Sequence, residues 1–400
     1  MSTKRLPDPL ITNLTKIKFK IIFFLMLFLV IFGLAKTSQG TTRAAASCSY
    51  ADILAAYTSA SAGDTVSIPA GTCTWGASDH LNITKQISII GAGTTSGSKV
   101  TKIIHDVLDD DDSVTPATFN ISVTSDVPVR ISGIYFDKVT NISGSTYPNI
   151  YREAIHISGS GNNGFALTQI RIDHNLFNRG CPSIFSHGYV YGVVDSNTFL
   201  NPNIAIYIVG DNTYAWDRPI AAGTRNAFFI EGNSFILDNN FGIGSSNEMI
   251  YPQEGARVVV RYNTYDASLY SRNDTPPFCT SHPNWGGIAP YYEEYRGQPI
   301  YEVYNNVVSL TSSYNTMTGF RGGSVIIHDN TITKSNPNTS EFIAGFTEEE
   351  GWTYGGPWCP NCPKITKWPA NDQIINSFIW NNYINGSLNN NIYLGETTSL

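Results

Sequence analysis

The chain has 400 residues, of which 14% are charged, and its formal net charge is −7. This length allows one large domain or two ordinary ones, and the negative charge argues against nucleic acid as a partner, since phosphate binding needs a concentrated basic face. Few charges together with abundant Gly, Asn, Ser, Thr and Tyr favour short strands and turns over long charged helices.

The N-terminus is typical of an export signal. Three lysines precede an apolar run at 21–35, which is short for a membrane-spanning helix, and RAAAS at 43–47 is a candidate cleavage site. We expect residues 1–46 to be a signal peptide or an uncleaved membrane anchor, which would be the chain's only membrane contact. Either way, the rest of the chain is expected to be secreted or at the cell surface.

Six cysteines fit an oxidising compartment. Cys48 and Cys73 bracket the first expected folded segment, and we expect them to form a disulfide. The CPNC sequence at 359–362 resembles half a zinc site, but zinc needs four ligands and no second CxxC is present. Disulfides are therefore favoured for the other four cysteines, with their pairing left open.

An irregular repeat dominates the sequence from residue 129 onward. In eight segments, apolar and polar residues alternate and are followed by one recurring position, any residue and then an apolar residue. We call the recurring position the ladder position. The segments are 129–136, 170–177, 192–199, 228–235, 258–265, 301–308, 325–332 and 377–384. The first segment has Ile134 at that position, and the others have Asn175, Asn197, Asn233, Asn263, Asn306, Asn330 and Asn382.

The asparagines are 22, 36, 30, 43, 24 and 52 residues apart, which indicates a coil of 22–24 residues with inserted loops. Alternation predicts strands with one buried face, and each Asn is expected to adopt a left-handed conformation and to bond its equivalents in neighbouring coils. This pattern predicts a parallel β-helix. A β-sandwich would show hairpin turns every 8–12 residues, and a propeller would need a longer repeat.

The segments at 48–75 and 83–93 resemble the cap helix and first coils of secreted right-handed β-helix proteins of the pectate-lyase type. With the repeated strands, this resemblance covers residues 47–390. It implies an all-β, single-stranded right-handed parallel β-helix over 47–400 with a short N-terminal cap helix. Proteins of this class mostly bind, cleave or eliminate polysaccharides, and some only bind or build surfaces.

Counting back nine or ten residues from four ladder asparagines reaches a polar residue followed by glycine: His187, Glu254, Arg296 and Arg321. We expect these residues to form one column, with neighbouring coils about 4.8 Å apart. Stacked guanidinium groups repel each other, so they need a carboxylate neighbour or an anionic ligand. The column is therefore either a subsite that grips uronate carboxylates or a turn motif in which Glu254 neutralises Arg296.

A long insertion at 266–297 lies beside this expected column. His282 is a candidate acid or base near neutral pH, and aromatic side chains stack on sugar rings. The substrate-binding candidates in the insertion are Arg272, Trp285, Tyr291 and Tyr292. Alternatively, this aromatic loop only packs on the β-helix.

Motifs of particular families are incomplete. The IRIDHN sequence at 170–175 resembles a strand motif of pectate lyases, in which Asp173 and His174 match the Asp-His pair. The Arg-x-Pro-x-x-Arg segment expected to hold the catalytic arginine of those enzymes is missing. The paired aspartates of polygalacturonases are missing too. The DDDD run at 109–112 could bind calcium, but a solvated loop is favoured because Ca²⁺ prefers alternating donors, so we expect no cofactor.

Together these features predict an extracellular polysaccharide lyase that acts on a uronate polymer. In this hypothesis Arg296 and Arg321 hold the substrate carboxylate, and His282 or one of the arginines removes the C5 proton. The alternative is a non-catalytic glycan-binding or cell-surface structural β-helix.

Overall fold

The computed structural model describes residues 40–76, 78–95, 99–105, 117–138, 153–159, 164–180, 182–202, 204–211, 215, 218–237, 249–269, 278–279, 298–310, 317–321, 323–334, 343–346 and 374–394. The chain divides into two compact units, Met1–Gly40 and Thr41–Leu400. The second unit is described below; the expected export segment lies almost wholly outside the described residues. Within these ranges, no helix is long and apolar enough to cross a membrane.

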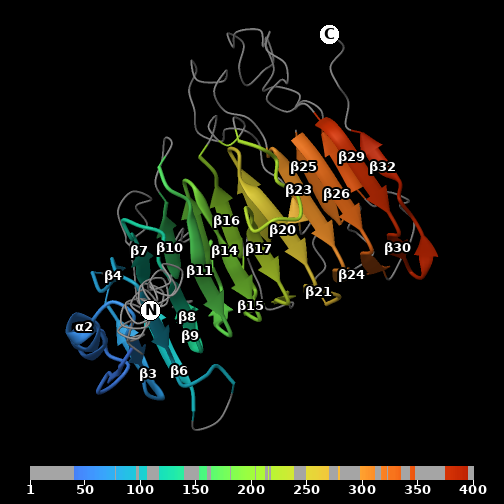
Figure 1. Cartoon of the computed structure of the whole chain (residues 1–400). Helices are drawn as coiled ribbons and strands as arrows, with labels where there is room; N and C mark the ends of the chain where they lie inside the picture. The colour runs from blue at the N-terminus through green and yellow to red at the C-terminus, as the bar shows by residue number, and fades with distance from the viewer. Residues whose placement is uncertain are drawn as a thin grey trace, which may run out of the picture. The chain divides into compact units, whose positions relative to one another are not determined.

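Three long sheets, which we call A, B and C, make up the second unit (Figure 1). Sheet A runs in the order β1 (Thr42–Ala44), β2 (Thr65–Ser67), β5 (Ile87–Ile90), β8 (Val129–Ser132), β11 (Leu167–Asp173), β14 (Val190–Asp195), β17 (Phe228–Glu231), β20 (Arg257–Arg261), β23 (Ile300–Tyr304), β26 (Gly323–His328) and β29 (Ile374–Trp380).

Sheet B contains β3 (Gly71–Trp75), β6 (Thr101–His105), β9 (Ile134–Lys138), β12 (Leu176–Asn178), β15 (Thr198–Leu200), β18 (Ser234–Ile236), β21 (Thr264–Ala267), β24 (Val307–Leu310), β27 (Thr331–Lys334), β30 (Tyr383–Ile384) and β31 (Ser387–Leu388). Sheet C contains β4 (Leu81–Ile83), β7 (Phe119–Ile121), β10 (Ile155–Ser158), β13 (Ile184–His187), β16 (Ile206–Val209), β19 (Ile250–Gln253), β22 (Phe278–Cys279), β25 (Thr318–Arg321), β28 (Ile343–Phe346) and β32 (Ile392–Leu394).

Successive strands along the chain pass from sheet A to B to C and back to A, so each coil adds one strand to each sheet. The strand pairs of the described residues are parallel, apart from the antiparallel hairpin β30–β31. The predicted parallel β-helix is therefore confirmed. Its right-handed sense stays a prediction, which the usual handedness of parallel crossovers supports.

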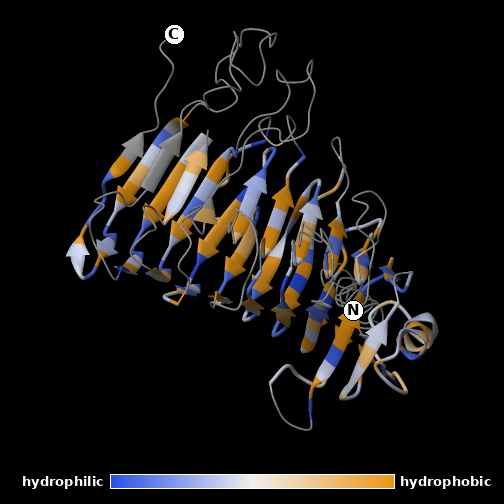
Figure 2. Ribbon diagram, turned by 180° about the vertical axis from the view of Figure 1, so that it is seen from behind, coloured by the Kyte–Doolittle hydropathy of each residue, from blue (hydrophilic) through white to orange (hydrophobic). Residues whose placement is uncertain are grey.

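The core runs along the inside of the coils. Strand residues alternate between buried and partly exposed positions, as in β5, β10 and β16, and Figure 2 shows the matching alternation of apolar and polar residues. On sheet B, the rings of Phe136, Phe177, Phe199 and Phe235 stack with centroids 4.9–5.1 Å apart. Each coil thus covers the apolar face of the coil before it.

The asparagine ladder lies at the turn between sheets A and B. The Nδ2 of Asn263 donates to the Oδ1 of Asn306 at 3.1 Å, and Asn306 donates to Asn330 at 2.9 Å. The same contact links the other ladder asparagines, which confirms the predicted ladder. Ile134 begins the series as a backbone donor to Asn175.

The expected left-handed conformation of these asparagines is wrong. The residue before each ladder position is left-handed instead: Gly133, His174, Ser196, Gly232, Tyr262, Asn305, Asp329 and Asn381. The chain turns at that residue, and the Asn that follows points its amide inward, where Asn306 is 1% exposed. The amide is thus free to bond both neighbouring coils.

Helix α2 (Tyr50–Ser59) caps the first coil. The hydroxyl of Ser49 accepts a hydrogen bond from the backbone N–H of Asp52, and the predicted Cys48–Cys73 disulfide is present. Strand β1 precedes this helix in the chain and pairs with β2, which follows it. Cleavage within 43–47 would remove or cut β1.

Candidate functional site

A strip of aromatic side chains follows the outer face of sheet C. Cross-strand pairing places His156, Phe185, Tyr207 and Tyr251 in one row, on β10, β13, β16 and β19. Their ring centroids lie 5.0, 5.1 and 5.2 Å apart in that order. The rings of His156, Phe185 and Tyr207 are partly exposed and provide stacking surface for the apolar faces of sugar rings, whereas Tyr251 is 8% exposed.

A second row runs beside this strip, with Ser158, His187, Val209 and Gln253 as cross-strand partners. The His187 ring lies 5.3 Å from the ring of His156 in an edge-on contact. Burial lowers the pKa of His187, and the neighbouring His156 lowers it further. The imidazole of His187 is therefore neutral near pH 7.

Glu153 stands at the start of this strip. Its Oε2 is 2.6 Å from Nδ1 of His156, which is a short hydrogen bond or ion pair between partly buried groups. This contact fixes the orientation of the His156 ring beside Phe185 and His187. The N-terminal end of the strip is thus a small polar cluster of one carboxylate and two imidazoles.

Glu254 lies directly after β19, next to Gln253 of the second row. Its backbone is left-handed, with φ of 51°. A side chain on Gly210 would bring its Cβ to 2.4 Å from the Glu254 carbonyl oxygen, so glycine there allows the two turns to pack. Burial raises the pKa of Glu254 to about 7, and the described residues supply no hydrogen-bond partner for its carboxylate. A carboxylate in this state is a candidate general base near neutral pH.

The first residue of β20, Arg257, anchors the connection between β16 and β17. Arg257, three residues after Glu254, is 3% exposed and donates hydrogen bonds to four backbone carbonyls of that connection. Arg218 of the same connection pairs with Asp211, and its guanidinium lies 3.5 Å from the ring centroid of Tyr189. The described part of this connection therefore forms a fixed wall beside the turn of Glu254.

The expected column is only partly present. His187 pairs through Val209 with Gln253 and not with Glu254, so the prediction that His187 and Glu254 share one column is wrong. Counting nine residues back from one Asn and ten from another hides a one-residue shift, and such a shift moves a side chain out of the row.

Arg321 ends β25, and its backbone continues the row of His187 and Gln253, because Ile250 pairs with Phe278 and Phe278 with Thr318. The sheet C strand between β19 and β25 is β22. Arg296 lies outside the described residues, so its stacking on Arg321 stays a prediction. The insertion is longer after β22 than before it. Arg272, His282, Trp285, Tyr291, Tyr292 and Arg296 lie outside the described residues.

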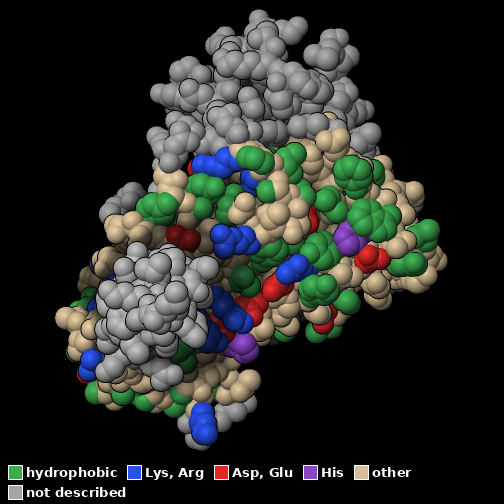
Figure 3. All heavy atoms as spheres, in the orientation of Figure 1, with side chains coloured by type: hydrophobic (Ala, Val, Ile, Leu, Met, Phe, Trp, Pro, Cys, Tyr) green, Lys and Arg blue, Asp and Glu red, His purple; other side chains and the backbone are tan. Residues whose placement is uncertain are grey.

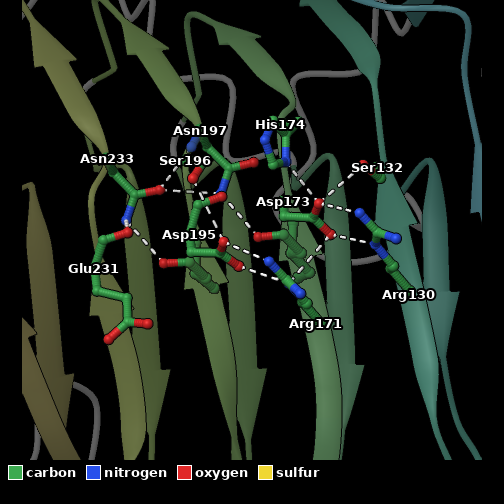
Figure 4. A network of polar contacts seen from close by, with 12 residues as sticks. Arg130, Ser132, Arg171, Asp173, His174, Asp195, Ser196, Asn197, Glu231 and Asn233 are labelled. Atoms are coloured by element: carbon green, nitrogen blue, oxygen red, sulfur yellow. Dashed lines mark hydrogen bonds and ion pairs between the residues drawn. The ribbon is translucent and has the colours of Figure 1, made fainter.

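A charged network, which the sequence analysis missed as a whole, covers the outer face of sheet A (Figure 4). Arg130 forms two hydrogen bonds of 2.6–2.7 Å with Asp173, and Arg171 forms two of 2.8–2.9 Å with Asp195. Burial alone would raise the pKa of Asp173, but the hydrogen bonds from Arg130 and His174 hold it below its usual value. Asp173 is fully buried, so it joins the coils and is not open to a substrate.

The repeat in the sequence already marks the row of residues to which Asp173 and Asp195 belong. The residue two before each ladder position lies on the outer face of sheet A: Ser132, Asp173, Asp195, Glu231, Arg261, Tyr304, His328 and Trp380. By contrast, no fixed spacing marks the aromatic strip on sheet C, because loops of variable length separate it from the ladder.

Within the described ranges, no group of three His, Cys, Asp or Glu side chains could hold a metal ion. The acidic run at 109–112, considered above for calcium, lies outside them.

No family model and no curated protein sequence matches the chain. Among solved structures, it is similar to the crystal structure of an alginate lyase from Paenibacillus sp. str. FPU-7, with a TM-score of 0.38 and 10% sequence identity. This similarity covers 89% of the present chain and 98% of the lyase chain. What sheet C can do chemically therefore follows from its own residues.

Proposed function

We propose that the chain binds an acidic extracellular polysaccharide along sheet C and cleaves it by β-elimination. The observation that carries this proposal is the aromatic strip from His156 to Tyr251, with the partly buried carboxyl of Glu254 one residue beyond the neighbouring row. The strip supplies a track for sugar rings, and Glu254 supplies a base with a pKa of about 7.

In the proposed reaction, the carboxylate of Glu254 takes the proton from C5 of a uronate residue. The C5–H electron pair forms the C4=C5 double bond, and the C4–O4 bond breaks. The leaving O4 takes a proton from water, and Glu254 later returns its proton to solvent.

A cation beside the uronate carboxylate makes the C5 proton more acidic. Arg321 supports this role because its backbone lies in the row of His187. The neutral imidazole of His187 offers a hydrogen bond to a sugar hydroxyl next to Phe185. His282 and Arg296 stay candidates from the sequence, as do Arg272, Trp285, Tyr291 and Tyr292 for substrate binding.

An extracellular location is part of this proposal. The Cys48–Cys73 disulfide supports it, because structural disulfides persist mainly in oxidising compartments.

The second candidate function is glycan binding without cleavage, which the continuous aromatic strip also favours. Two measurements on the full chain separate these functions. One follows the ultraviolet absorbance of unsaturated uronates on a panel of acidic and neutral polysaccharides, with and without Ca²⁺. The other measures binding of the same polymers by calorimetry.

A rise in absorbance on a uronate polymer supports elimination, and loss of that rise in Glu254→Gln assigns the base. Glu231→Gln is the matched control, because Glu231 lies on sheet A in an ion pair with Arg261. Binding without product would favour the second candidate. If no polymer is bound or cleaved, the proposed function is wrong.

A further inference from the structure

Tyr262 is an outlier in the left-handed column between sheets A and B. The other members of that column are Gly, His, Ser, Asn or Asp, whereas Tyr262 carries a bulky ring at φ of 56°. A bulky residue in this conformation costs about 1–3 kcal/mol and persists where the strain serves a role. Yet its side chain is 57% exposed, so burial does not offset the strain.

Tyr262 adjoins a row of stacked rings on sheet A. Its ring centroid is 6.2 Å from that of Tyr304, which lies 4.7 Å from His328, and His328 lies 4.2 Å from Trp380. The last two contacts are nearly parallel, with interplanar angles of 6°. Phe378 lies two residues before Trp380 on the same face. It is 56% exposed, and Trp380 is 40% exposed.

We call Tyr262, Tyr304, His328, Phe378 and Trp380 the sheet A aromatic surface. Figure 3 shows hydrophobic and histidine side chains gathered towards the C-terminal strands of sheet A, beyond the alternating basic and acidic side chains. From β20 to β29 the surface crosses three steps between neighbouring strands, which is about 14 Å. A pyranose unit is about as long as one such step, so several sugar units fit along it.

The charges around this surface exclude a polyanion. Arg261 is paired with Glu231 at 2.6 Å and also donates to the hydroxyl of Tyr304. Asp329 lies 2.6 Å from Nδ1 of His328. Two carboxylates thus flank one already paired arginine. A uronate chain would meet net negative charge here, whereas a neutral sugar would not.

We propose that the sheet A aromatic surface binds a neutral polysaccharide chain, separately from the acidic substrate of sheet C. The exposed rings of Tyr262, Phe378 and Trp380 stack on sugar faces, and the carboxylates of Glu231 and Asp329 accept hydrogen bonds from sugar hydroxyls. The surface anchors the protein to a matrix that it does not cleave. This role does not depend on whether sheet C is catalytic.

The test is calorimetry on the full chain with neutral hexasaccharides of glucose, xylose and mannose and with a uronate hexasaccharide. Tyr262→Asn keeps a residue suited to the left-handed turn, so it removes the ring without disturbing the fold. Trp380→Ala removes the other end of the surface. Phe165→Ala is the matched control, because Phe165 is 39% exposed and lies outside the surface.

We expect at least one neutral hexasaccharide to bind, with affinity at least fivefold weaker in Tyr262→Asn and in Trp380→Ala and unchanged in Phe165→Ala. Binding of the uronate hexasaccharide should be the same in all three variants. The proposal is overturned if no neutral sugar binds, or if both variants bind it like the original chain. It is also overturned if sedimentation shows a dimer that Trp380→Ala dissociates, since the surface then binds a second copy.

Discussion

Glu254 and His187 belong to different rows of sheet C. His187 pairs through Val209 with Gln253, and Glu254 lies one residue further, in a left-handed turn. The Glu254 carboxyl is partly buried and its pKa is raised, while the His187 imidazole lies beside the aromatic strip.

The raised pKa of Glu254 predicts a pH effect on stability. In the folded protein Glu254 holds its proton up to about pH 7, whereas an unfolded glutamate loses it near pH 4.5. The contribution of this protonation to the free energy of unfolding is therefore complete below pH 4.5 and is lost as the pH rises through 7. This loss amounts to at most about 3 kcal/mol. Urea unfolding should show that, between pH 4 and pH 8, the stability of Glu254→Gln falls less than that of the original chain. An equal fall in both proteins would contradict the assigned burial.

Removing one ladder amide should destabilise the β-helix strongly. Asn306 accepts two hydrogen bonds from Asn263 and donates to the backbone oxygen of Val260, all within the core. Asn306→Ala leaves these buried groups without partners and should cost about 2–4 kcal/mol. Denaturant unfolding measures this. Asn305→Gly, at the left-handed position just before, should change stability by less than about 1 kcal/mol; equal costs would refute the ladder's role.

Arg257 should hold the connection between β16 and β17 in place. Arg257→Met removes donors to four carbonyl oxygens, and we expect a cost of about 2–4 kcal/mol together with faster cleavage by trypsin after Arg218 or Arg225. Arg171→Met is the control, because its ion pair with Asp195 is exposed and contributes less than about 1 kcal/mol. Unchanged proteolysis in Arg257→Met would show that other contacts hold the connection.

The disulfide should stabilise the N-terminal coil. Cys48 and Cys73 are 25 residues apart, and closing a loop of this size contributes about 2–4 kcal/mol. Cys73→Ser should lower the free energy of unfolding by that amount, and adding a reductant should lower it equally in the original chain. An original chain insensitive to reductant under unfolding conditions would contradict this contribution.

The strands of sheets A and B were predictable, because a short turn links them and each ladder asparagine follows the turn at a constant distance. The residues two positions before each ladder residue, from Asp173 to Trp380, form a row on sheet A. Aligning the coils on their asparagines is enough to find this row. Sheet C was not predictable, since β15 and β16 are separated by 5 residues, 201–205, whereas β18 and β19 are separated by 13, 237–249. Such variation hides which residue faces outward. The register of Glu254 was wrong because it was counted nine residues back from Asn263, whereas His187 was counted ten back from Asn197.

The measurement that tests the central claim most directly is the rate of unsaturated uronate formation against pH for the original chain, Glu254→Gln and Glu231→Gln. With Glu254 as the base, the rate of the original chain rises through about pH 7, Glu231→Gln follows the same curve, and Glu254→Gln is at least a hundredfold slower throughout. A Glu254→Gln variant that cleaves as fast as the original chain would contradict the assignment of the base. Absence of product from all three proteins on every uronate polymer would contradict the lyase itself.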